Sequence, residues 1–106
     1  MVQKSAVLNV KKNGRKIVTD QFVVLFLDNH TQDAAYAVHI RKRFGNAVER
    51  NRAKRVFRAS LRQLKEMIRG VDLIVIPRRG GKGLGVPGMA PLLEKSFAKA
   101  GLSQER

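Results

Sequence analysis

The sequence predicts a small α+β fold: an α/β sandwich in the order α-β-β-α-β-α, with the helices packed mainly on one face of a sheet. Two apolar runs of strand length, residues 21–27 and 73–77, predict the sheet. Apolar residues that recur at spacings of three and four over residues 53–68 predict an amphipathic helix. The 106 residues have the length of a single domain, residues 1–106.

The first part of the chain is expected to supply a helix and two strands. Ser5 to Lys12 suits a short helix that Asn13-Gly14 ends. The run QFVVLFL, residues 21–27, is apolar on both faces and therefore predicts a central strand, which the polar turn at residues 28–33 follows. Residues 35–41 alternate and predict a second strand. Its core-facing side holds Tyr36, Val38 and Ile40, and its outward side holds Ala37, His39 and Arg41.

The second part begins with a long helix. Asn46 is a favourable N-cap, and Glu49 at the third helical position completes an Asn-x-x-Glu capping box. The apolar stripe continues to Gly70, the expected C-terminal cap.

A strand, a loop and a helix complete the chain. LIVIP (residues 73–77) predicts a buried strand, and the glycine-rich residues 78–88 predict a loop. This loop lacks the GxxxxGK[ST] pattern of a phosphate-binding loop. Residues 89–100 suit an amphipathic helix that Gly101 ends; its inner side holds Leu92, Leu93, Ser96, Phe97 and Ala100.

The charge indicates an anionic partner. The 22 Lys and Arg residues against 8 Asp and Glu residues give a net charge of +14, and such an excess repels itself unless a polyanion neutralises it. Nucleic acid, an anionic membrane surface and an acidic protein all qualify. No apolar run approaches the length of a membrane span, and the N-terminal residues lack a signal-peptide pattern, so we expect a cytoplasmic protein without a membrane partner.

The basic residues gather on one edge of the long helix. With about 100° per residue, they form a stripe roughly a third of a turn from the apolar one. A charged stripe is usually a solvated face, but such faces normally mix signs, whereas only Glu49 and Glu66 are acidic between Arg41 and Arg69. We therefore favour nucleic acid over a solvated face. The stripe comprises Asn51, Lys54, Arg55, Arg58, Arg62, Lys65 and Arg69.

At these residues the sequence resembles the protein subunit of bacterial ribonuclease P. The resemblance rests on Gly45-Asn46-Ala47-Val48, Arg50-Asn51-Arg52, Lys54-Arg55 and Arg58, spaced as in the signature of that family, and weaker similarity covers most of the chain. It implies an RNA-binding subunit of a ribonucleoprotein endonuclease, a hydrolase of tRNA processing. A catalytic RNA, with Mg²⁺ held mainly by that RNA, removes the 5′ leader from precursor tRNA. The resemblance also implies a left-handed βαβ crossover around the long helix, contrary to the usual hand.

The resemblance implies two binding surfaces and no catalytic residue in the protein. The signature helix would dock on the catalytic RNA, and a cleft between the first helix and the sheet would bind the leader. Combined with the basic stripe, the expected RNA-binding residues are Lys42, Arg43, Asn46, Arg50, Asn51, Arg52, Lys54, Arg55, Arg58 and Arg62. The expected cleft residues are Val7, Lys11, Leu25, His39 and Arg41. Val7, Lys11 and Leu25 stand where the family commonly places aromatic residues, so leader contact here should depend more on charge than on stacking.

Two other functions remain open. A ribosomal or RNA-chaperone-like protein would explain the charge alone. A protein-only nuclease is disfavoured, because the acidic residues are scattered and the two histidines, His30 and His39, have no companions at metal-ligand spacing. No metal site is expected in the protein.

Overall fold

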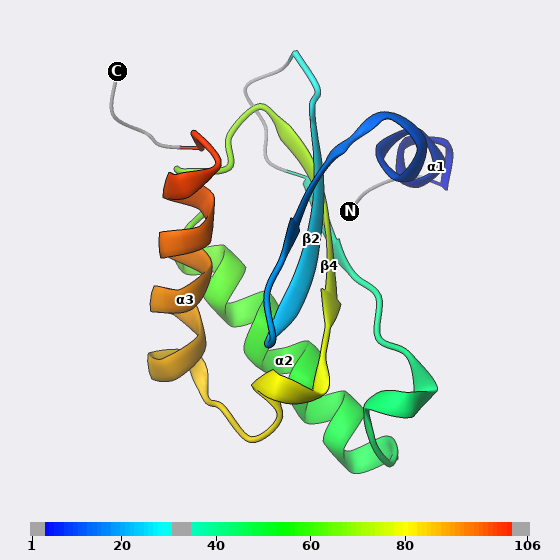
Figure 1. Ribbon diagram of the computed structural model, residues 1–106, viewed down its shortest axis with the longest axis vertical. Helices are drawn as coiled ribbons and strands as arrows, with labels where there is room; N and C mark the ends of the chain where they lie inside the picture. Colours follow the sequence, from blue (N-terminus) through cyan, green and yellow to red (C-terminus); the bar gives the residue numbers. More distant parts are fainter. Residues whose placement is uncertain (1–3, 31–34, 103–106) are drawn as a thin grey trace.

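The computed structural model describes residues 4–30 and 35–102, and its helices and strands follow the expected order with one addition (Figure 1). The three helices and four strands are joined by two short 3-10 turns. In chain order they are α1 (Lys4–Asn13), β1 (Arg15–Val18), β2 (Phe22–Asp28), β3 (Ala35–Val38), η1 (Lys42–Phe44), α2 (Ala47–Gln63), β4 (Val71–Pro77), η2 (Arg79–Gly81) and α3 (Val86–Lys99).

The four strands form one sheet in the order β1-β2-β4-β3. β1 pairs antiparallel with β2, β2 antiparallel with β4, and β3 parallel with β4. The central strand expected at residues 21–27 is therefore confirmed as β2, and the buried strand expected at residues 73–77 is confirmed as β4. β1 was not predicted: it is a four-residue edge strand in which only Ile17 is half-buried, so it lacks an apolar pattern.

The helices lie on both sides of the sheet, with two of the three on one face. Figure 1 shows α2 and α3 on one side and α1 on the other. The core fills the space between the sheet and the α2–α3 layer, where Phe22 meets Phe57 edge-on at 6.1 Å between ring centroids. The other face is covered more narrowly: α1 packs on β2 and β4, and its Val10 is fully buried.

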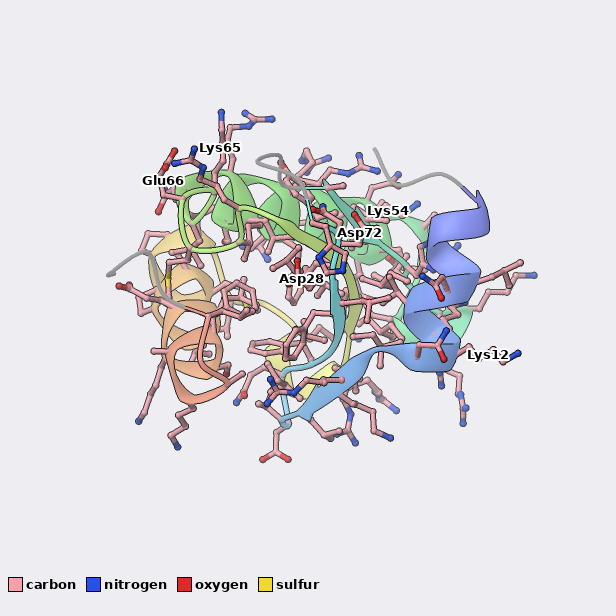
Figure 2. The ribbon with its side chains drawn as sticks, turned by 90° about the horizontal axis from the view of Figure 1, so that it is seen from above. Lys12, Asp28, Lys54, Lys65, Glu66 and Asp72 are labelled. Carbon is pink, nitrogen blue, oxygen red and sulfur yellow. The ribbon has the colours of Figure 1, made fainter. Side chains whose placement is uncertain are left out.

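The connection β3–α2–β4 is left-handed, as the family resemblance implied. β3 and β4 are parallel neighbours. In Figure 1 both strands run downward with β3 behind β4, and α2 returns upward on the left; Figure 2, seen from above, gives the same depth order. Most βαβ units have the opposite hand.

Two predicted elements are longer than the observed ones. α2 ends at Gln63 rather than at Gly70, and residues 64–70 continue as turns whose hydrogen bonds span three residues, such as Met67 N to Leu64 O at 2.9 Å. Leu64 and Ile68 are still buried, so the apolar spacing was correct although the hydrogen bonding changes. β3 ends at Val38, although the next residue still donates its N–H to Val75 O at 2.9 Å.

Candidate nucleic-acid interface

The first turn of α2 is fixed by the predicted capping box. The Asn46 side chain accepts a hydrogen bond from Glu49 N at 2.8 Å, and Glu49 Oε1 accepts one from Asn46 N at 2.9 Å. The other carboxylate oxygen of Glu49 lies 3.2 Å from Lys82 Nζ in the glycine-rich loop. The backbone hydrogen bond from Asn46, and secondly Lys82, hold the pKa of Glu49 below its ordinary value. The start of the basic helix is thus tied to the loop after β4.

Two arginines of the signature are also anchored to the protein. Arg50 is half-buried and donates from Nη1 to Gly45 O at 2.8 Å. Arg52 is exposed and donates from Nη1 to Leu84 O at 3.3 Å. On a helical wheel Arg50 lies near the apolar stripe and Arg52 on the far side of it, so neither belongs to the basic stripe itself. Both anchors hold α2 against the segments on its two flanks.

The remaining basic residues of α2 form an open face. Arg55, Arg58 and Arg62 are exposed, and within the described part of the chain their side chains make no hydrogen bond or ion pair. Asn51 is exposed beside them, and Lys54, labelled in Figure 2, is half-buried at the inner edge. We call Asn51, Lys54, Arg55, Arg58 and Arg62 the α2 basic face. Beyond it, Arg69 pairs with Glu66 at 3.1 Å.

Lys11 of α1 lies near His39, the residue that follows β3, and we call this pair the Lys11–His39 corner. The pKa of His39 lies below its ordinary value because the ring is partly buried and, secondly, because the Lys11 ammonium is nearby. Lys11 is exposed and His39 is half-buried. The structure therefore brings together two of the predicted cleft residues, which come from different elements.

The other predicted cleft residues are less closely grouped. Leu25 is half-buried on β2, where it pairs with Ile74 of β4, which in turn pairs with Ala37. Val7 belongs to α1, but its side chain lies outside the described part of the structure. Arg41 is exposed and lines a separate hollow at the end of β3 and β4.

That hollow reveals two arginines that sequence reasoning missed. It has a volume of about 420 Å³ and brings together Arg41 and Arg43 with Arg78 and Arg79. Arg78 also donates from Nη1 to Thr19 O at 2.8 Å. β3 and β4 are parallel, so their carboxyl ends lie at the same edge of the sheet. The two pairs of arginines that follow these strands in the sequence could therefore have predicted this cluster. Lys42 is exposed in the same turn as Arg43.

The described residues, 4–30 and 35–102, contain no group of three or more His, Asp or Glu side chains that could hold a metal ion. Nor does any helix in that part of the chain have both the length and the apolar character needed to cross a membrane. The exposed guanidinium and ammonium side chains of the surface can bind anionic groups.

Comparisons with known proteins agree with this geometry. The family model described as Ribonuclease P matches residues 1–101. The ribonuclease P protein component of an Exiguobacterium species is 33% identical over 97 residues, covering 92% of this chain and 85% of the relative. That of Bacillus velezensis is 33% identical over 94 residues, covering 88% and 81%.

Solved structures show the same fold. The RNase P protein of Staphylococcus aureus superposes with a TM-score of 0.81 at 28% identity and covers 97% of this chain and 95% of its own. That of Thermotoga maritima gives a TM-score of 0.79 at 27% identity, covering 92% and 94%.

Fold and surface together define a class: a small basic α+β protein with a left-handed βαβ unit and one cationic helix face open to solvent. Within that class the family match is specific and spans nearly the whole chain. The chain belongs to the bacterial ribonuclease P protein family.

Proposed function

We propose that this chain is the RNA-binding subunit of a cytoplasmic ribonuclease P, in which it assists a catalytic RNA in removing the 5′ leader from precursor tRNA. Membership of the family supports the assignment to the ribonuclease P complex. In this proposal the RNA performs the cleavage and the protein binds RNA.

The observation that carries the proposal is the α2 basic face. Arg55, Arg58 and Arg62 are exposed on a rigid helix and have no carboxylate partner among the described residues. Like charges three and four residues apart destabilise a helix unless an external anion neutralises them. Guanidinium groups bind phosphate oxygens in pairs of hydrogen bonds, which suits an RNA backbone. The α2 basic face is therefore the proposed contact with the catalytic RNA.

The leader is proposed to run past the Lys11–His39 corner toward the arginine hollow. Lys11 and His39 lie at one end of this path, and Arg41, Arg43, Arg78 and Arg79 lie at the other. Half-buried Leu25 offers an apolar surface but no ring for stacking. The contact with a single strand would thus be mainly electrostatic and strongly dependent on salt.

Mg²⁺ is proposed to act on the RNA side of the complex. Phosphate oxygens and water are hard ligands of the kind that Mg²⁺ prefers. The role of the protein in this scheme is to neutralise phosphate charge, which would lower the Mg²⁺ concentration that the RNA needs.

The test is reconstitution with a bacterial ribonuclease P RNA and precursor tRNA at low Mg²⁺. Addition of the protein should increase the rate of leader removal. The double variant Arg55→Ala/Arg58→Ala should lose most of that increase, whereas Lys12→Ala, on the outer side of α1 (Figure 2), should retain it. No gain with the wild-type protein would contradict the proposal, and cleavage by the protein alone would favour a protein-only nuclease.

A further inference from the structure

A groove between β1 and α3 lies on the face of the sheet opposite α1. Its volume is about 490 Å³, and its walls include Arg15 and Ile17 of β1 and Leu92, Lys95 and Lys99 of α3, with Phe26 of β2 between them. Figure 1 shows α3 on the side of the sheet opposite α1, the helix that carries Lys11. The groove is therefore separate from the proposed leader path.

The charged residues of the groove are all cationic. Arg15, Lys16, Lys95 and Lys99 line it, and its lining contains no acidic residue. None of the four pairs with a carboxylate in residues 4–30 and 35–102. Lys95 and Lys99 are also four residues apart on one helix face, an arrangement that is unfavourable unless an anion lies between or above them. The charge of this surface is thus uncompensated within the described protein.

The floor of the groove is apolar. Ile17, Leu92 and Ala100 are half-buried hydrophobic residues packed against the core. The Arg15 guanidinium lies over the Phe26 ring, 5.2 Å from its centroid, and both residues line the groove. Flat cations and apolar surfaces accept nucleobases, while lysines at the rim accept phosphates.

We propose that this groove binds a short segment of single-stranded RNA, independently of the α2 basic face and the leader path. The phosphates would lie against Lys95 and Lys99, and a base would cover the apolar floor beside Arg15. The neighbouring hollow beyond Arg15 contains Asp28, whose carboxylate would repel a phosphate and so limit the segment at that end. This inference goes beyond the proposed function, because leader removal does not require a second single-stranded site.

The test is a site-resolved NMR titration of the full chain with pentauridylate. Backbone signals of residues 15–17 and 92–99 should shift together with one apparent affinity. Lys95→Glu and Lys99→Glu should each weaken binding at these signals and lower its log–log salt slope by about 0.7, the contribution of one phosphate contact on a single strand. Lys65→Glu, at another exposed lysine, which lies beyond the end of α2, is the control and should leave the groove affinity and its salt slope unchanged.

Three outcomes would overturn the proposal. They are shifts confined to residues 39–43 and α2, equal weakening by Lys65→Glu, or equally large groove shifts with hexaglutamate, which would indicate an acidic protein partner instead. Arg55→Ala/Arg58→Ala should not change the groove signals. Absence of pentauridylate binding at the groove would therefore leave the proposed function intact. Loss of binding to the catalytic RNA, with the groove signals still shifting as expected, would contradict only the proposed function.

Discussion

Arginines of α2 that look alike in the sequence should behave differently when they are replaced. Arg50 donates to Gly45 O, whereas Arg55 has no polar partner among the described residues. Arg55→Ala should lower the log–log salt slope of RNA binding by about 0.7–0.9 without lowering the free energy of unfolding. Arg50→Ala should lower that free energy by about 1 kcal/mol, the usual net contribution of such a hydrogen bond. Salt titrations and urea unfolding measure the two quantities, and identical behaviour of both variants would contradict the distinction.

His39 should make the stability of the free protein depend on pH. Its pKa in the folded state lies below the ordinary value of 6.5, so the unfolded state takes up the proton first as the pH falls. The stabilisation from neutral His39 is therefore complete above about pH 6.5. It is lost as the pH falls from 6.5 toward the pKa of His39 in the folded state. Urea unfolding above and below this pH should show that the free energy of unfolding falls as the pH falls. The fall should be smaller in His39→Gln than in the wild type. An equal decline in the variant would assign the effect to other groups.

Local chemistry determined which single residues could be predicted. The capping box was predictable because Asn46 and Glu49 are three residues apart, and each side chain accepts a hydrogen bond from the other residue's backbone N–H. The anchors of Arg50 and Arg52 were not, because Gly45 O and Leu84 O become acceptors only through the path of the folded chain. Arg78 and Arg79 join Arg41 and Arg43 through the parallel pairing of β3 and β4, a tertiary feature.

At the scale of elements, the start of α2 should depend on its cap. Asn46→Ala removes an acceptor for Glu49 N and should lower the free energy of unfolding by about 1 kcal/mol. Asn51→Ala is the control: Asn51 is exposed within the helix, where alanine is the better helix former, so stability should stay equal or rise by up to about 0.7 kcal/mol. Urea unfolding of both variants distinguishes a cap effect from a general loss of asparagine. A loss in Asn51→Ala as large as that in Asn46→Ala would contradict it.

The elements that periodicity predicted well are those that bury a full face. β2 and β4 alternate in burial or are almost fully buried, and both were expected within two residues of their observed bounds. β1 was not predicted because it is an edge strand, and three of its four residues are exposed. Its sequence therefore has no apolar pattern. The end of α2 was missed because Leu64 and Ile68 remain in the core while the chain changes from helix to turns. Apolar spacing indicates which residues are buried, but the backbone hydrogen bonds can change from those of a helix to those of turns while the same residues stay buried.

At the scale of the whole molecule, the net charge should oppose folding at low salt. The protein carries +14 within extents of 37 × 29 × 20 Å. The Debye length is about 30 Å at 0.01 M salt and about 8 Å at 0.15 M, so the charges repel one another across the whole protein only at the lower salt. The melting temperature should therefore rise with salt over this range. A relief of about 1 kcal/mol would correspond to about 4–8 °C for a domain of this size.

A charge-reversed variant separates this repulsion from a general effect of salt. Arg58→Glu/Arg62→Glu replaces two exposed cations of the α2 basic face by anions, and it should show a smaller rise of the melting temperature than the wild type. The same variant should bind RNA more weakly, because the charges that oppose folding are those proposed to meet phosphate. Circular dichroism at both salt concentrations measures the first effect and a binding titration the second. A melting temperature that falls with salt in the wild type would mean that internal ion pairs outweigh the repulsion, and the argument for an external polyanion would lose its energetic basis.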